Sequence, residues 1–153
     1  MKANSKLPPL SELMDDIQQW FASDLGNQLL EAEQLVLDQI VGSVFGYHLL
    51  QVSLIPSKDL LRQSTASHKF EMLPRVALGM PEEGVVGQAC DLPFASECID
   101  AVVLHHALDF AQSPHQVLRE AARVLRPGGK LVVVGFNPTS FWGIYRRITA
   151  HRN

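Results

Sequence analysis

The chain has 153 residues, of which 46% are hydrophobic and 19% are charged, and its formal net charge is -3. This length fits one domain, residues 1–153, and the composition excludes a disordered chain and a basic face for nucleic acid. The apolar runs are far shorter than the roughly 20 residues of a membrane span, and the first residues carry no secretory signal, so we expect a cytoplasmic protein. Cys90 and Cys98 lack the paired spacing of a zinc site and are expected to be reduced thiols.

Two amphipathic helices are predicted before the first strand. Apolar residues recur at helical spacing over residues 11–21, with Ser11 as the capping residue of this helix. Gly26 interrupts the pattern, and a second helix over residues 27–41 follows with its leucines and valines on one broad face. We therefore expect residues 1–45 to form an N-terminal helical extension.

Short apolar segments then indicate buried strands. The segment "FGYHLLQVSL", residues 45–54, is bounded by a glycine and a proline, and a helix is expected to begin near Ser57. The segment "SHKFEML", residues 67–73, gives a weaker strand signal. The segment "VVGQACDLPF", residues 85–94, predicts a strand that leads into a turn.

The second half of the chain continues this alternation of strands and helices. Residues 99–108, "IDAVVLHHAL", show no polar alternation before their histidines, as in strands that are covered on both faces. The helix over residues 113–125 opens with Ser113 and Gln116 at the spacing of a capping box, and "KLVVVGF", residues 130–136, is predicted to be another buried strand. This order favours an α/β fold with a mostly parallel sheet.

Three segments in this order resemble the class I S-adenosylmethionine-dependent methyltransferases, particularly the small-molecule type. They are "CDLPFASECIDAVVLHHAL", "SPHQVLREAARVLRPGGKLVVVGFNP" and, more weakly, "GYHLLQVSL". In that family an Asp-Leu-Pro-Phe turn follows the third strand, a strand opening with Asp is the fourth, and a helix ending in Arg-x-Leu-x-Pro-Gly-Gly leads into the fifth. The resemblance covers residues 46–140 and implies a three-layer Rossmann-like core preceded by helices, as in a bacterial subgroup.

The resemblance also implies a site for S-adenosyl-L-methionine at the carboxyl ends of the strands. Asp91 would accept a hydrogen bond from the adenine amine, and the backbone near Leu92 would meet the ring. A second interpretation, that Asp91 is a turn residue whose carboxylate caps local backbone, stays open. Ser53 and Leu54 would lie against the cofactor after the first strand, and Glu71 is the candidate for binding the ribose hydroxyls.

The loop after the first predicted strand departs from the family's pattern. Members commonly carry acidic-x-Gly-x-Gly-x-Gly there, because glycine lets the backbone approach the cofactor, whereas residues 51–57 of this chain read "QVSLIPS". Ile55 followed by Pro56 restricts the backbone further, and Asp59 adds a carboxylate that Lys58 could offset. The alternative function is therefore a non-catalytic methyltransferase-like fold that binds a ligand or another protein.

His105 and His106 follow the predicted fourth strand, where the family often places substrate-facing or catalytic groups. One of them is a candidate general base toward a small-molecule acceptor, since an unperturbed histidine has a pKa of about 6.5, and His105 is also a candidate cofactor contact. The other interpretation is a histidine satisfied by hydrogen bonds in a polar pocket. Adjacent strand residues point to opposite faces, and no carboxylate or cysteine at ligand spacing joins them, so no metal site is predicted.

The last predicted strand raises a question about assembly. The family's sheet adds two further strands that this sequence does not supply, so "KLVVVGF" would be an apolar edge strand of the kind that proteins normally protect. Either the chain is a fragment of a longer protein or a second copy covers residues 130–136 in a homodimer. The sequence thus predicts a methyltransferase of unknown acceptor, with no nucleic acid or membrane as partner.

Overall fold

A computed structural model describes residues 8–55, 59–82 and 84–137. Its five strands form one parallel sheet in the order β3-β2-β1-β4-β5, which confirms the predicted α/β fold class. The strands are β1 (His48–Ser53), β2 (His68–Leu73), β3 (Val85–Val86), β4 (Ile99–His105) and β5 (Leu125–Val134), and the helices are α1 (Leu10–Phe21), α2 (Asp24–Gly42) and α3 (Pro114–Val124).

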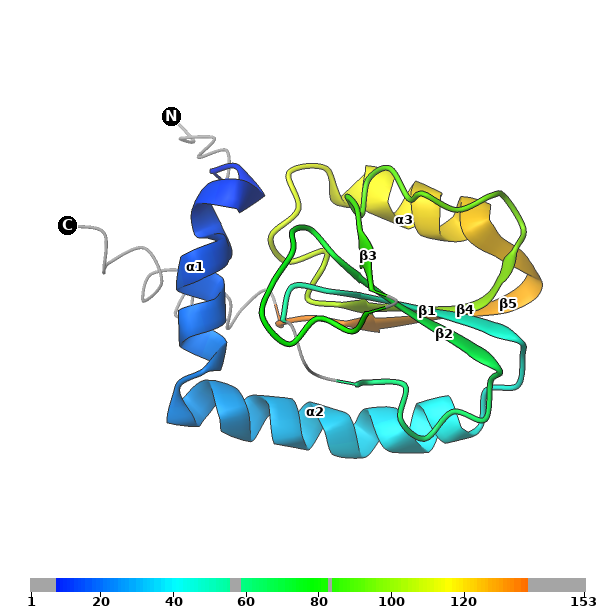
Figure 1. Cartoon of the computed structure of the whole chain (residues 1–153), viewed down its shortest axis with the longest axis horizontal. Helices are drawn as coiled ribbons and strands as arrows, with labels where there is room; N and C mark the ends of the chain where they lie inside the picture. The colour runs from blue at the N-terminus through cyan, green and yellow to red at the C-terminus, as the bar shows by residue number, and fades with distance from the viewer. Residues whose placement is uncertain (1–7, 56–58, 83, 138–153) are drawn as a thin grey trace.

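Helices α2 and α3 cover opposite faces of the sheet, so that the molecule has three layers (Figure 1). Each face has its own core. The core under α2 includes Leu37, Val41, Leu49, Ala101 and Val103, and the core under α3 includes Leu50, Val52, Val102, Leu104, Val117 and Ala121. Because successive strand side chains alternate, β1 and β4 supply both cores, which explains why their sequences are continuous apolar runs.

Helix α1 packs near the carboxyl ends of the strands rather than on a face (Figure 1). A third core joins this helix to the residues that follow β1 and β4. Its buried members are Leu13, Met14, Ile17, Phe21, Leu30, Leu54, Ile55 and Phe110. The loop after β1 therefore contributes two large side chains to the docking of α1, and one of them, Ile55, stands where the resembled family carries glycine.

The predicted helix near Ser57 is absent from residues 59–67, which contain only a turn, while Ser57 and Lys58 lie outside the described residues. Short polar side chains explain this difference, because they bond to nearby backbone in place of a helical carbonyl. The Asp59 carboxylate accepts a bond from the Leu61 N–H at 3.1 Å, and the Ser64 hydroxyl accepts one from the Ala66 N–H at 3.0 Å.

Two predicted helix starts are corrected by the structure. Helix α1 begins at Leu10, one residue before Ser11, and helix α2 begins at Asp24, so that Gly26 lies inside it. The Ser23 hydroxyl caps α2 by accepting a bond from the Gly26 N–H at 3.2 Å. Ser113 stands at the start of α3 as predicted, but its hydroxyl makes no capping bond.

Strand β5 lies at the edge of the described sheet, as predicted, but it is not buried. Leu131 is 39% exposed and Val133 is 47% exposed, and neither belongs to the core under α3, whereas Val132 and Val134 pack against the core under α2. A homodimer through residues 130–136 stays a prediction.

Two further expectations concern the cysteines and membrane-spanning segments. Cys90 and Cys98 are free thiols, as predicted. Of the helices in the described ranges, none combines the length and the apolar character that crossing a membrane requires.

Candidate functional site

A cavity of about 400 Å³ lies at the carboxyl edge of the sheet. It is lined by the ends of β1 and β2, by the segments that follow β3 and β4, and by the start of α1. The strand order reverses here, since β1 lies between β2 and β4, and open parallel sheets bind their ligands at such a point. Small-ligand sites commonly have volumes of about 300–1,000 Å³, so the cavity is large enough for one.

Ser53 and Leu54, both predicted to contact the cofactor, line this cavity. Ser53 is the last residue of β1 and pairs in register with His105 of β4. Its hydroxyl accepts a bond from the Ile55 N–H at 3.1 Å and lies 3.2 Å from His105 Nδ1. The loop is therefore held by a side chain of its own, and it presents Leu54 rather than bare backbone.

Glu71 lies outside the cavity lining. Its neighbour Met72 lines the cavity, and strand alternation directs Glu71 to the other face, where the Gln51 amide donates to it at 3.4 Å. Burial and the charge of Asp59 raise the pKa of Glu71 to about 7. Arg75, which follows β2, lines the cavity instead, so a cation occupies the region where the resemblance implies a carboxylate.

We expect the substitution Glu71→Gln to change how stability depends on pH. The folded-state pKa of Glu71 lies above the unfolded value of about 4.3, so the folded protein holds this proton more tightly. The resulting stabilisation is complete below about pH 4.3 and is lost as the pH rises through about 7. At pH 8 the variant should be more stable than the wild type by about 1 kcal/mol, a figure reduced because the side chain is half-buried and screened by solvent.

Urea unfolding of the Glu71→Gln variant at pH 5 and pH 8 tests this prediction. The exposed Glu31 supplies the matched control, Glu31→Gln, which should shift little between the two conditions. An equal difference between wild type and Glu71→Gln at both pH values would contradict the prediction.

The turn after β3 brings different residues to the cavity from those predicted. The Asp91 N–H donates to the Gln88 carbonyl at 3.0 Å and the Asp91 side chain is exposed, whereas Gln88, Ala89 and Cys90 line the cavity. Leu92 is 3% exposed, and its N–H already donates to the Glu120 carboxylate at 2.8 Å. Gln88 was missed because the resemblance rested on the Asp-Leu-Pro-Phe turn, although its position two residues after a short strand could have identified it.

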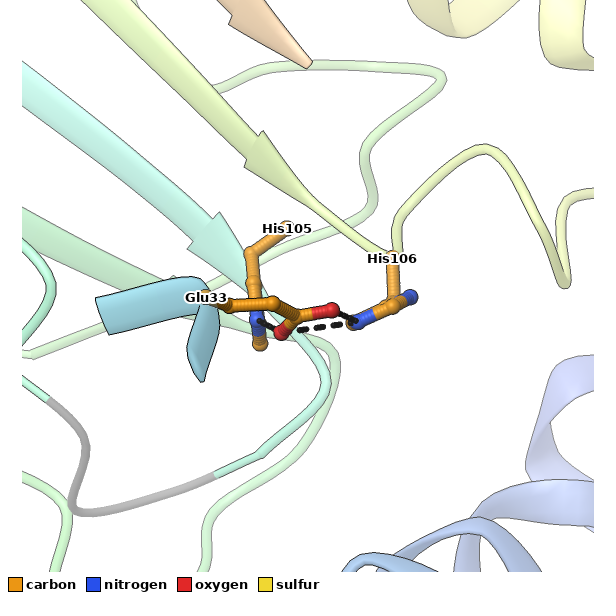
Figure 2. A group of neighbouring side chains, drawn as sticks. All are labelled: Glu33, His105 and His106. Carbon is orange, nitrogen blue, oxygen red and sulfur yellow. Dashed lines mark hydrogen bonds and ion pairs between the residues drawn. The ribbon is translucent and has the colours of Figure 1, made fainter. Parts of the chain in front are cut away.

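The two histidines meet in a buried polar cluster with a carboxylate from α2 (Figure 2). His105 Nε2 lies 2.9 Å from Glu33 Oε2, and His106 Nε2 lies 3.0 Å from Glu33 Oε1. His106 Nδ1 lies 2.8 Å from Asp109 Oδ2. Both imidazoles are 0% exposed, which supports the interpretation of histidines satisfied by hydrogen bonds.

Opposing effects set the protonation of this cluster. Burial alone would raise the pKa of Glu33, but hydrogen bonds from the two histidines hold that pKa at about 2. Burial lowers the pKa of His105 below its ordinary value. Burial also disfavours the charged form of His106, but the bonds to Asp109 and Glu33 outweigh it and raise the pKa of His106.

The geometry of His106 corrects the expectation that adjacent histidines point to opposite faces. β4 ends at His105, and His106 follows with a φ of 55°, in the left-handed region that is uncommon outside glycine. This backbone conformation brings both Nε2 atoms to one carboxylate. Glu33 could not be identified from the sequence, because it precedes His105 by 72 residues and looks like any polar residue of an amphipathic helix.

Comparison with known proteins identifies the family. A family model described as a methyltransferase domain matches residues 35–133, from the middle of α2 to the end of β5. This chain belongs to the methyltransferase domain family. The resemblance noted from the sequence is therefore confirmed.

Two curated relatives of this methyltransferase domain match most of the chain. The chain is 36% identical over 109 residues to the uncharacterized protein YafS of Escherichia coli. This match covers 71% of the chain and 44% of YafS. It is 30% identical over 154 residues to a demethylmenaquinone methyltransferase of Renibacterium salmoninarum. This match covers 91% of the chain and 63% of that enzyme. The chain thus spans between two fifths and two thirds of these relatives' lengths.

Solved structures share the fold of the domain. An S-adenosylmethionine-dependent methyltransferase of Thermotoga maritima, described as a possible histamine N-methyltransferase, superposes with a TM-score of 0.60 at 20% identity, over 94% of this chain and 68% of that one. A putative methyltransferase of Bacillus halodurans superposes with a TM-score of 0.58 at 21% identity, over 80% of this chain and 60% of that one. Both likenesses support the Rossmann-like fold.

Proposed function

We propose that this methyltransferase domain binds S-adenosylmethionine in the cavity and catalyses the transfer of its methyl group to a small-molecule acceptor. The observation that carries the proposal is the position of the cavity, at the reversal of strand order between β1 and β4. Membership of the family and the activities named for its relatives support the same conclusion. A cytoplasmic location is part of the proposal.

Residues from two walls of the cavity would hold the cofactor. Ser53 and Leu54 offer backbone and hydroxyl groups at the end of β1. The carboxamide of Gln88 combines a donor with an acceptor, as recognition of an adenine edge requires, and we assign to it the role that the resemblance implies for Asp91. Leu92 supports this wall from the core, where its carbonyl accepts a bond from Arg123 at 3.0 Å.

The reaction places few demands on side chains. When bound, S-adenosylmethionine supplies an activated methyl group on its sulfonium. In-line transfer to a nucleophile then depends mainly on positioning and on the exclusion of water. Apolar walls from Val52, Met72 and Phe110 provide that exclusion. His105 is the candidate general base. It does not line the cavity, but its Nδ1 lies 3.2 Å from the hydroxyl of Ser53, which does, whereas His106 lies between two carboxylates.

A second candidate function is a methyltransferase-like fold without catalysis, which binds a ligand or another protein. The packing of the loop after β1 favours it, since Leu54 is 4% exposed and Ile55 is 7% exposed in the core beneath α1. Ile55 stands at one of the positions where the family's glycines would admit the cofactor, and Leu54 stands beside it.

Calorimetric titration with S-adenosylmethionine and with S-adenosylhomocysteine distinguishes the two functions. We expect saturable binding of both, and a melting temperature that rises by about 5–10 °C at a hundredfold excess over Kd. The substitution Ala89→Trp places a large side chain in the cavity and should weaken binding at least about tenfold, or about 1.4 kcal/mol. The matched control is Ala122→Trp, on the exposed face of α3. Absence of binding to the wild-type chain would favour the second function.

A further inference from the structure

Three side chains from two distant segments direct metal-binding atoms toward one point (Figure 2). Glu33 comes from the middle of α2, and His105 and His106 come from the end of β4. The two Nε2 atoms and a carboxylate oxygen all lie within 4.8 Å of one another. Zn²⁺ bonds of about 2.0–2.1 Å in a tetrahedral site place the ligand atoms about 3.3 Å apart, so small side-chain movements of about 1 Å would suffice.

The other ring nitrogen of each histidine has its own partner. His105 Nδ1 lies 3.2 Å from the Ser53 hydroxyl, and His106 Nδ1 lies 2.8 Å from the Asp109 carboxylate. Asp109 is fixed in turn by the Phe136 N–H, which donates to it at 3.1 Å. Histidines that bind metals are oriented by such outer partners, which leave the inner nitrogen free to coordinate.

The backbone at His106 is an independent observation. Its φ of 55° is uncommon for a residue with a Cβ, and such conformations persist where the surrounding structure requires them. Here the conformation turns the His106 ring back toward Glu33. A hydrogen bond from the His106 N–H to the Val134 carbonyl, at 2.8 Å, holds it in place.

The balance of charge favours a cation at this point. The cluster contains two carboxylates, Glu33 and Asp109, and two fully buried imidazoles. The two carboxylates bring negative charge to this point, and buried charge that is not balanced costs free energy. A divalent cation on two neutral imidazoles and one carboxylate, with Asp109 behind, brings the net charge to zero.

We propose that Glu33, His105 and His106 bind one divalent transition-metal ion, for which Zn²⁺ is the probe. Two imidazoles and one carboxylate form a donor set that suits Zn²⁺ and its neighbours. The Glu33 side chain is 13% exposed, whereas both imidazoles are fully buried. The ion links α2 to the end of β4. Its role is to stabilise this contact, which lies next to Ser53 in the lining of the cavity. The proposal rests on the geometry of this cluster and not on the proposed methyl transfer, and with the ion bound His105 is a ligand rather than the general base.

Metal retention by the purified chain tests this site. A protein freed of any histidine tag is stripped with EDTA, incubated with two equivalents of ZnCl₂ and desalted, and its zinc content is then measured by mass spectrometry. We expect about one equivalent to remain, and the melting temperature to rise by about 5–10 °C at a hundredfold excess over Kd. A wild-type chain that retains no zinc would overturn the proposal.

Matched variants separate this site from adventitious binding. Glu33→Gln should weaken Zn²⁺ affinity at least a hundredfold, whereas Glu31→Gln on the same helix should not change it. Asp109→Asn keeps an acceptor for His106 Nδ1, so that it should fold, and it should weaken affinity about 10–100-fold. His115→Ala controls for an exposed histidine. Equal retention by the wild type and by folded Glu33→Gln and Asp109→Asn would also overturn the site.

Discussion

The substitution Glu33→Ala will lower the free energy of unfolding of the metal-free protein by about 3–5 kcal/mol. Glu33 accepts bonds from both His105 and His106, at 2.9 Å and 3.0 Å. Its removal leaves two buried ring nitrogens without their acceptor, and it takes away one of the two carboxylates that raise the pKa of His106. Breaking one partner of a buried ionic cluster is far more costly than removing a surface pair, because the remaining charge cannot reach water.

Urea unfolding in the presence of EDTA measures this effect. Glu31→Ala is the control, since Glu31 lies two residues away on the same helix and is exposed. Its free energy of unfolding should stay within about 0.5 kcal/mol of the wild-type value. If the two variants were destabilised equally, helix α2 would be responding to the loss of any glutamate, and the buried cluster would have no special role in stability.

The substitution Gly26→Ala will destabilise the fold by about 3 kcal/mol, at the upper end of the usual cost of overpacking. A Cβ at this position would lie 2.5 Å from Phe21 Cα and 2.7 Å from the Phe21 carbonyl oxygen, and it would also overlap the Trp20 carbonyl oxygen. All of these are backbone atoms at the end of α1, which cannot move aside as a flexible side chain can. The two helices would have to separate, which would open the core that contains Phe21.

Gly42→Ala provides the opposite case on the same helix. The nearest atom to a Cβ there is the Gln63 carbonyl oxygen at 3.9 Å, which is ordinary contact. Alanine has the higher helix propensity, so Gly42→Ala should leave stability unchanged or raise it by up to about 1 kcal/mol. Thermal unfolding of both variants measures this difference in stability. A Gly26→Ala protein as stable as Gly42→Ala would show that the close approach of α1 and α2 is not required.

Much of the fold follows from local patterns in the sequence. Continuous apolar runs predicted β1 and β4 because both strands are covered on two faces, and helical periodicity predicted α1, α2 and α3. The exposure of β5 could not be predicted in the same way, since an apolar edge strand and an apolar central strand have the same pattern. The turn that follows Asp59 was mistaken for a helix, because the hydrogen bonds that Asp59 and Ser64 accept from backbone N–H groups are not visible in apolar spacing.

The site was less predictable than the fold. Ser53 and Leu54, which the resemblance implied, line the cavity at the carboxyl end of β1, at an edge where parallel sheets bind ligands. The cluster of Glu33 with two histidines depends on a contact between α2 and β4 and on the left-handed backbone of His106. Neither feature can be predicted from the local sequence pattern. A family motif also drew attention to Asp91, although the turn places Gln88 on the cavity.

The strand order has a consequence for how the chain acquires its structure during synthesis. β1 lies in the middle of the sheet, but its second neighbour, β4, ends at residue 105, more than fifty residues later. A nascent chain that has emerged only through β3 therefore exposes one edge of β1, together with the face of α2 that will cover β4. Long-range pairing of this kind slows folding and leaves partly formed sheets open to aggregation. The completion of β4 is thus the step in translation at which β1 gains its second neighbour and α2 gains the strand that it covers.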